Sequence, residues 1–209
     1  MQFDLRASID NYDTFVFDFD GVIKDSVPAK SKAFSLLFSS YPSVLPRIVA
    51  HHLANGGISR DYKLPLYMSW CGIDPSDINV STYTSSFSSI VSSLVINSPF
   101  VLGIYNYLEF LSSNSKRLYI LSATPQQEII DISLALQLTQ YFSTKNIYGH
   151  PATKSSILQR LSLTSPVLFF GDSLSDFQSS IDSNVDFVFC STNPSVTIPN
   201  NTPTISSFL

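Results

Sequence analysis

The sequence has few charged residues, few cysteines and no long apolar runs. Charged residues make up 13% of its 209 residues and the net charge is -4, so no basic surface for nucleic acid or acidic lipid is expected. Its two cysteines, Cys71 and Cys190, lie far apart and show neither metal-ligand spacing nor a disulfide framework. No apolar run has the length that spans a bilayer, and the N-terminus carries acids where a signal peptide carries basic residues. We therefore expect a cytoplasmic protein without nucleic-acid or membrane partners.

The order of apolar patterns predicts an α/β fold. The first strand is expected over residues 14–19. Between Pro28 and Pro99 apolar residues recur at three- and four-residue steps, which predicts several helices and no strands. After Pro99 helices alternate with short apolar segments, which indicates a parallel, doubly wound sheet. We therefore expect a Rossmann-like core formed by residues 1–25 and 99–209, with an all-helical cap domain inserted at residues 26–98.

The first candidate motif is FVFDFDG, residues 15–21, where phenylalanines alternate with Val16, Asp18 and Asp20. Alternation along a strand sends both carboxylates to one face. Two like charges leaving a buried strand repel each other and lose hydration unless a cation or a proton lies between them. One carboxylate can attack phosphorus while the second, held protonated, acts as general acid and then as general base. Solvated or capping acids are the alternative.

The second motif is LSATPQQE, residues 121–128. A strand is expected to end at Ser122, and a helix to begin with Thr124 as its N-cap and Pro125 at its first position. A hydroxyl beside the positive end of a helix is an anion-binding arrangement. Hydroxyls that only cap and turn the chain are the alternative.

The third motif is Lys154 in HPATKSSIL. Thr153 can cap the following helix, which places this lysine in the first turn, where the helix dipole disfavours a cation. A negative group such as a phosphoryl oxygen would compensate for that placement. An exposed lysine at a helix start is the alternative.

The fourth motif is VLFFGDSLSD, residues 167–176. Asp172 leaves a buried strand as Asp18 does, and Asp176 follows one helical turn later. Aspartates at adjacent strand ends supply the hard oxygen ligands that suit a magnesium ion. The alternative is that Asp172 and Ser173 only cap the helix.

Taken together and in this order, the motifs resemble those of the haloacid dehalogenase-like superfamily. FDFDGVIKDS is similar to its DxDGxxxDS signature, ILSAT to its Ser/Thr signature after a hydrophobic strand, Lys154 to its lysine and GDSLSD to its GDSxxD signature. The resemblance covers nearly the whole chain and places the helical insertion where subfamily I has its type 1 cap. Within the superfamily the chain looks like the phosphoglycolate phosphatases and β-phosphoglucomutases.

The resemblance implies a role for each motif. Asp18 would be the nucleophile that forms an aspartyl-phosphate, and Asp20 the general acid and base. The residues expected to hold the phosphoryl group are Ser122, Ala123 and Lys154. The expected ligands of a Mg²⁺ cofactor are Asp18, the main-chain carbonyl of Asp20, and Asp172, with Asp176 and Ser173 in support.

Cap domains of this superfamily select the substrate, and the segment HHLANGGISRDYKL is similar to a loop that its sugar-phosphate mutases use for that purpose. The expected substrate contacts are Gly57, Ser59 and Arg60. Arg60 offers a planar fork to a second phosphate or a carboxylate, whereas a helix-helix turn with Arg60 on its surface is equally consistent. Lys30 and Lys32 either face an anionic ligand or lie on a solvated helix face.

The function implied is a Mg²⁺-dependent phosphatase that hydrolyses a small phosphate ester, a sugar phosphate or a phosphoglycolate-like compound, as a monomer or homodimer. The alternative is a β-phosphoglucomutase-like phosphosugar mutase. Such mutases often carry a glutamate before the aspartate of the fourth motif, where this chain has Gly171, so the phosphatase is favoured. Dehalogenase or phosphonatase chemistry would be expected to lack Asp20. A non-catalytic binding module would be expected to have lost a catalytic acid, and none is missing.

Overall fold

The computed structural model describes residues 3–191 and 196–209. Its strands are β1 (Thr14–Phe17), β2 (Arg117–Pro125), β3 (Ile147–His150), β4 (Val167–Gly171), β5 (Asp186–Cys190) and β6 (Thr204–Ile205). Its α-helices are α1 (Val27–Leu37), α2 (Leu45–Ala54), α3 (Arg60–Trp70), α4 (Asp77–Asn97), α5 (Ile104–Ser113), α6 (Gln126–Ala135), α7 (Lys154–Ser162) and α8 (Leu174–Ser183). Short 3-10 helices cover Ala7–Asp10, Leu138–Gln140 and Thr144–Asn146.

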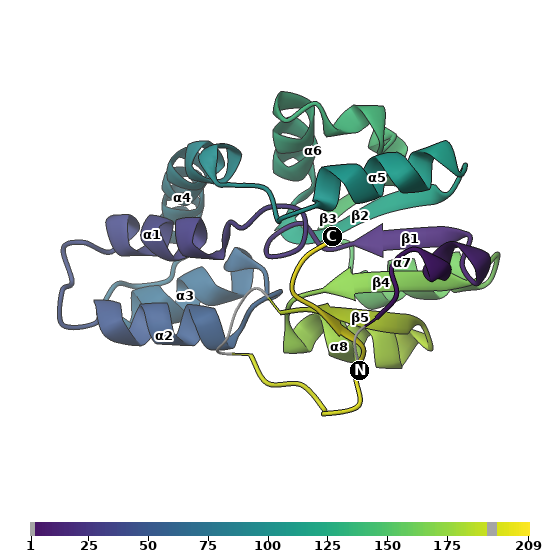
Figure 1. Ribbon diagram of the computed structural model, residues 1–209. Coiled ribbons are helices and arrows are strands. Elements are labelled where there is room, and N and C mark those ends of the chain that lie inside the picture. The colour runs from purple at the N-terminus through teal and green to yellow at the C-terminus, as the bar shows by residue number, and fades with distance from the viewer. Residues whose placement is uncertain (1–2, 192–195) are drawn as a thin grey trace.

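The strands form one sheet in the order β3-β2-β1-β4-β5-β6, and every neighbouring pair is parallel. Parallel neighbours need crossover connections, and the helices after Pro99 lie in the connections that lead from β1 to β5. Figure 1 shows α5 and α6 on one side of the sheet and α8 on the other. The predicted α/β fold with a Rossmann-like parallel sheet is confirmed.

The alternation along β1 gives the sheet a different core on each face. Phe15 and Phe17 are fully buried in the larger core, which also contains apolar residues of α5 and α6. The ring of Phe17 stacks on that of Phe170 from β4, with centroids 5.0 Å apart. Val16 points to the smaller core, which includes apolar residues of α7. Because β1 is buried on both faces, its run of apolar residues is continuous, as expected for a central parallel strand.

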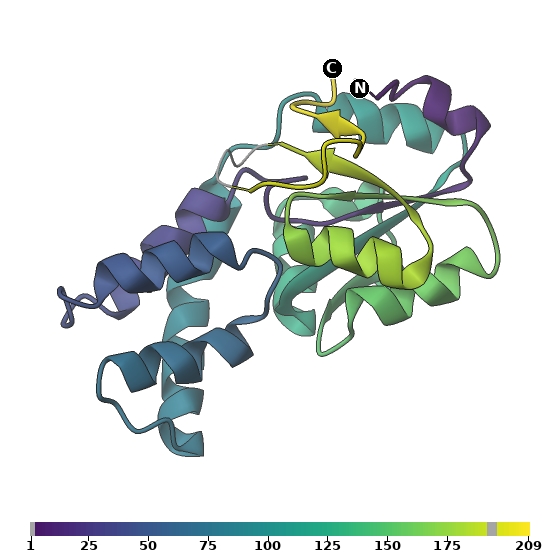
Figure 2. The same ribbon diagram turned by 90° about the horizontal axis from the view of Figure 1, so that it is seen from below.

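Helices α1 to α4 lie between β1 and β2 in the sequence and pack against one another. The ring of Phe34 in α1 contacts that of Phe87 in α4, with centroids 4.3 Å apart, and that of Tyr67 in α3, at 5.2 Å. Figures 1 and 2 show this helical segment beside the sheet, at the end toward which β1 points, rather than over either face. That residues 26–98 form a separate cap domain stays a prediction. No α-helix in the described ranges is long and apolar enough to cross a bilayer.

Two chain crossings join the helical segment to the sheet, and they lie side by side. The Asp25 N–H donates to the carbonyl oxygen of Pro99 at 2.9 Å, and the Val101 N–H donates to that of Ile23 at 3.0 Å. The loop that follows β1 is therefore fixed to the chain that returns from α4. This pairing holds the helical segment over the carboxyl ends of the strands, where ligands bind in parallel sheets.

Candidate active site

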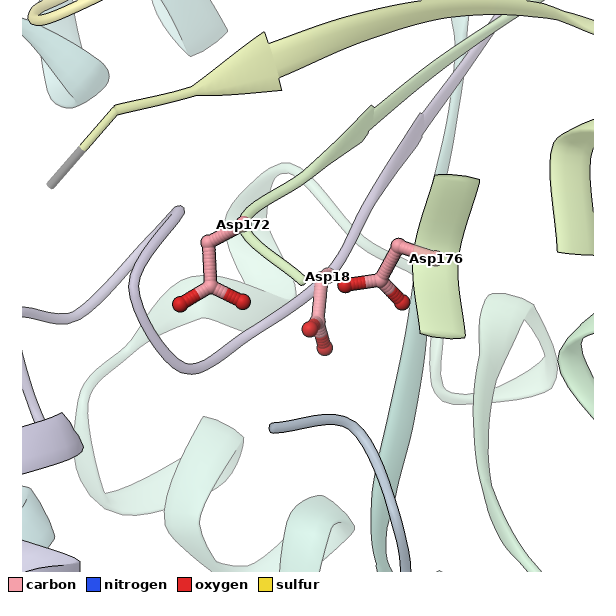
Figure 3. Close-up of side chains that lie close together, drawn as sticks. All are labelled: Asp18, Asp172 and Asp176. Carbon is pink, nitrogen blue, oxygen red and sulfur yellow. The ribbon is translucent and has the colours of Figure 1, made fainter. Parts of the chain in front are cut away.

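Three buried aspartates meet at the carboxyl ends of β1 and β4. Asp18 follows β1, and its N–H still donates to the carbonyl oxygen of Phe170 in β4 at 2.8 Å. Asp172 follows β4, and Asp176 lies in the first turn of α8. The three residues are 3%, 6% and 0% exposed, and each offers a carboxylate oxygen within 4.8 Å of the others. Figure 3 shows the three side chains close together at this edge of the sheet.

Gly21 allows the loop after Asp18 to approach Asp172. Its φ of +79° lies in the left-handed region, and a Cβ at this position would be 2.0 Å from Oδ2 of Asp172. The Gly21 N–H also donates to the carbonyl oxygen of Lys24 at 2.7 Å, which closes the turn. Glycine is therefore required here both by the backbone conformation and by the close carboxylate.

Ser173 and Asp176 form a capping box at the start of α8. The hydroxyl of Ser173 accepts from the Asp176 N–H at 3.2 Å, and Oδ2 of Asp176 accepts from both the hydroxyl and the N–H of Ser173, at 2.6 and 3.2 Å. The other oxygen of Asp176 accepts from the ammonium of Lys154, which also lies 2.9 Å from Oδ2 of Asp18. Asp176 therefore both caps α8 and forms an ion pair with Lys154.

The carboxylates outnumber the cation between them. Burial, followed by the charges of Asp176 and Asp20, raises the pKa of Asp18 to about 8 although Lys154 opposes the shift. Burial and the charge of Asp18 raise the pKa of Asp172 well above its usual value. Burial works against the charge of Lys154, but Asp176 and Asp18 outweigh it and raise the pKa of the lysine. A divalent cation would relieve this excess of negative charge, and the oxygen ligands of the cluster fit one.

Asp20 has a different environment from Asp18. Its carboxylate accepts from the hydroxyl of Ser26 at 2.6 Å and from the ammonium of Lys30, which also donates to the hydroxyl of Thr124 at 3.1 Å. Burial opposes ionisation, but Lys30 and Ser26 outweigh it and lower the pKa of Asp20. Lys30 therefore lies in the site, whereas Lys32 on the same helix is exposed. A metal-ligand role for the Asp20 carbonyl stays a prediction.

The expected helix start in the second motif is wrong. Strand β2 continues through Thr124 to Pro125, α6 begins at Gln126, and no side chain caps its first turn. The strand is longer because Pro125 pairs with His150 of β3 after a shift in register. The hydroxyl of Ser122 accepts from the Thr124 N–H at 3.1 Å, within the stretch of β2 where the register with β3 shifts.

The acids open into a cavity of about 60 Å³ between the sheet edge and the helical segment. Its polar and charged lining from the sheet side is Asp18, Asp20, Thr124, Asp172 and Ser173, and from the helices Lys30, His52, Arg60 and Lys63. Of the predicted phosphate-binding residues, Ala123 also lines this cavity. Ser122 and Lys154 line an adjoining cavity of about 240 Å³, which shares Ala123 and Gly57 with the first. The four motifs are therefore brought to one region.

The three residues expected to contact substrate from the helical segment have structural partners. Gly57 has a φ of +75°, and a Cβ there would be 2.7 Å from the hydroxyl of Ser173, so this loop lies against the start of α8. Ser59 caps α3 by accepting from the Asp61 N–H at 3.3 Å. Arg60 is only 5% exposed, which excludes a surface position. It lines the cavity, but its guanidinium donates to both oxygens of Glu128 in α6. A substrate role for Arg60 stays a prediction.

Sequence reasoning missed two residues that line the cavity. Lys63 lies three residues after Arg60 in α3, so the helical period places both on one face, and that spacing was a usable signal. His52 comes from α2 and reaches the same wall. Its neighbour His51 instead contacts the hydroxyl of Tyr67 through Nδ1 at 3.0 Å.

Comparisons with known proteins agree with this architecture. A family model described as haloacid dehalogenase-like hydrolase matches residues 15–190. A curated relative from Thermotoga maritima, named phosphorylated carbohydrates phosphatase, is 26% identical over 183 residues, which cover 83% of this chain and 82% of the relative.

Solved structures share the fold at lower identity. A haloacid dehalogenase-like hydrolase of family IA from Entamoeba histolytica has a TM-score of 0.75 and 14% identity, covering 94% of this chain and 93% of that one. A β-phosphoglucomutase from Clostridium difficile has a TM-score of 0.72 and 17% identity, covering 94% and 91%. Since the family model spans most of the chain, the expectation of an enzyme is confirmed, and this protein belongs to the haloacid dehalogenase-like hydrolase family.

Proposed function

We propose that this protein is a phosphatase that uses Mg²⁺ to hydrolyse a small phosphate ester, a sugar phosphate or a phosphoglycolate-like compound. The proposal rests on one observation, the group of Asp18, Asp172 and Asp176 whose carboxylate oxygens lie within 4.8 Å of one another. Lys154 contacts two of the three, and Asp18 and Asp172 line a cavity that has further charged side chains in its wall. The name of the Thermotoga maritima relative, a phosphatase of phosphorylated carbohydrates, supports the same substrate class.

In this mechanism Asp18 is the nucleophile. One of its carboxylate oxygens forms a bond to phosphorus while the ester P–O bond breaks, and the leaving oxygen takes a proton from Asp20. Asp20 then accepts a proton from a water molecule that attacks the aspartyl-phosphate, which releases inorganic phosphate and regenerates the Asp18 carboxylate. Lys154 holds Asp18 in position and contributes positive charge beside the transferring group.

Asp20 must gain a proton before it can act as an acid. Its ion pair with Lys30 lowers its pKa, so it is ionised in the ligand-free site. A phosphate dianion bound beside it would raise its pKa and would compete for Lys30. Substrate binding itself therefore favours the protonated form of Asp20. A bound Mg²⁺, held by Asp18, Asp172 and the main-chain carbonyl of Asp20, would neutralise charge on the phosphoryl group.

We also propose that residues 26–98 act as a cap over a core formed by residues 1–25 and 99–209. The cavity is lined from both sides, and the loop at Gly57 lies against Ser173 at the start of α8. Ion pairs also connect the helical segment to the core, from Arg60 to Glu128 and from Asp61 to His150 at 3.0 Å. The substrate would therefore be enclosed between the two parts during the reaction.

A phosphosugar mutase is the alternative, and the packing around Gly171 argues against it. A Cβ at this position would be 2.4 Å from Cβ of Asp176 and 2.9 Å from the ring of Phe187. A glutamate before Asp172, as mutases of the superfamily often have, would therefore need the space that Asp176 occupies. This chain is built for the phosphatase form of the fourth motif.

The test is phosphate release from purified protein given a panel of sugar phosphates and phosphoglycolate, with Mg²⁺ and with EDTA. We expect release only with Mg²⁺, and none from an Asp18→Asn variant. Asp13→Asn is the matched control, because the Asp13 side chain is 65% exposed and lies at the other end of β1. Isomerised product without free phosphate, given a bisphosphate primer, would favour the mutase. If folded protein gave neither phosphate release nor isomerised product from any ester, both would be refuted.

A further inference from the structure

Lys63 is a buried cation in the cavity wall without an acidic partner. It is 4% exposed, and its ammonium lies 3.3 Å from Nδ1 of His52, which is 7% exposed. Within the described ranges it forms no ion pair with a carboxylate. The other two cations of this wall are engaged, Lys30 with Asp20 and Arg60 with Glu128. Lys63 therefore leaves positive charge uncompensated at the helical side of the cavity.

The contact between Lys63 and His52 links the protonation of the two side chains. When Lys63 is charged, its ammonium only donates hydrogen bonds, so Nδ1 of His52 accepts and the ring proton is on Nε2. Burial and the charge of Lys63 lower the pKa of His52 to about 3, which keeps the ring neutral. Among the described residues Nε2 is buried and has no hydrogen-bond partner. An N–H group in that position costs stability unless something binds it.

The cavity thus has two walls of opposite character. The sheet side carries Asp18 and Asp172, whose excess negative charge suits a metal and the phosphoryl group it would neutralise. The helical side carries the ammonium of Lys63, which has no carboxylate partner among the described residues, and Nε2 of His52, which has no hydrogen-bond partner there. An anion placed between these donors would accept charge-assisted hydrogen bonds from a fully desolvated site.

We propose that Lys63 and His52 bind a second anionic group, a carboxylate or a phosphate, on the substrate whose phosphate ester is cleaved at Asp18. The inference rests on the proposed phosphatase function and narrows its substrate to small phosphorylated acids or bisphosphates. Neutral sugar monophosphates would leave Lys63 without an opposite charge and Nε2 of His52 without a hydrogen-bond partner.

A purely structural role explains Lys63 less well. Burial, followed by the charge of Lys30, lowers its pKa to about 7, so the position disfavours the charged form that lysine normally has. An apolar side chain of similar length would fill the space without that cost. A lysine that is buried at a cost in hydration free energy points to a ligand that compensates for that cost.

The test compares three esters with the same two-carbon skeleton: ethylene glycol monophosphate, phosphoglycolate and ethylene glycol bisphosphate. We expect the wild type to favour at least one of the two doubly anionic esters by about tenfold or more in kcat/KM over the monophosphate. Phosphoglycolate and the bisphosphate distinguish a carboxylate from a phosphate as the second group. Lys63→Met should abolish the preference, and Lys63→Arg should restore part of it. His52→Phe, which keeps a ring against Phe34, should weaken it.

Lys32→Met is the matched control, because it removes an exposed lysine from the same helical segment and should leave the preference unchanged. Equal kcat/KM for all three esters in the wild type, or a preference that survives Lys63→Met, overturns the inference while the phosphatase function stands. If the wild type hydrolyses none of the three, calorimetric binding to the Asp18→Asn variant decides. Tighter binding of a doubly anionic ester that is lost with Lys63→Met supports the site, and equal binding of all three overturns it.

Discussion

The affinity of this protein for Mg²⁺ should rise about tenfold per pH unit as the pH increases from about 6 to about 8, and then level off. The reason is the proton on Asp18, whose pKa is raised to about 8 by burial and by the neighbouring acids. Below that value the carboxyl is mostly protonated in the metal-free protein, and a cation must displace the proton. At pH 7, one unit below the pKa, affinity should be about tenfold weaker than the plateau value. Asp172, whose pKa is also raised, can steepen the dependence.

Isothermal titration calorimetry with MgCl₂ at several pH values measures this directly. Repeating each titration in two buffers of different ionisation enthalpy counts the protons released, and we expect close to one per Mg²⁺ near pH 7. The Asp18→Asn variant is the control, because an amide has no proton to release, so its slope should be smaller. A wild-type affinity that is flat between pH 6 and 8, or an identical slope in the variant, would refute the assignment of the proton to Asp18.

Three further predictions concern stability and binding. Glu128→Gln should lower the free energy of unfolding, measured in urea, by about 3 kcal/mol, because it leaves the buried guanidinium of Arg60 without a carboxylate. Adding Arg60→Met should recover part of that loss. No recovery in the double variant would argue against a stabilising ion pair between the two residues. Asp18→Asn should stabilise the metal-free protein, and the gain should grow from pH of about 4 to about 8, since the folded pKa lies above the ordinary 3.8 and ionisation therefore destabilises the wild type over that range. A pH-independent gain in urea unfolding with EDTA would contradict this. Gly21→Ala should greatly weaken Mg²⁺ binding in calorimetry, because its Cβ would overlap the carboxylate of Asp172, and wild-type affinity would show that the loop adjusts.

The core of the site could be predicted because parallel strands converge. Asp18 and Asp172 each follow a buried apolar strand, and once both strands belong to one parallel sheet their carboxyl ends share an edge. The alternation of helices with short apolar segments after Pro99 was sufficient to predict the sheet, and the apolar spacing between Pro28 and Pro99 was sufficient to predict the helices there. Each of these signals is local in the sequence, and the parallel arrangement of the strands brings the residues concerned close together in space.

The helix start after Ser122 shows where local signals fail. Thr124 and Pro125 have the residue types of a helix N-terminus, yet the strand continues because Pro125 pairs with His150 of β3, a partner from a distant part of the chain. A tertiary contact thus overrides a capping preference worth about 1 kcal/mol. The same failure affects Arg60, whose partner Glu128 lies 68 residues away.

The contact between His52 and Lys63 in the helical wall could not be predicted, for a physical reason that also bears on the function of this wall. No rule comparable to the convergence of parallel strands determines which residues of two packed helices meet, so the contact of His52 with Lys63 depends on the packing of α2 and α3 as a whole. The acids at the sheet edge can therefore remain while helix packing changes what faces them. In the proposed mechanism the chemistry is determined by Asp18 and its neighbours, and the choice of substrate by the side chains that the helices present. If so, replacing Lys63 should alter which ester is hydrolysed, whereas replacing Asp18 should abolish hydrolysis of every ester.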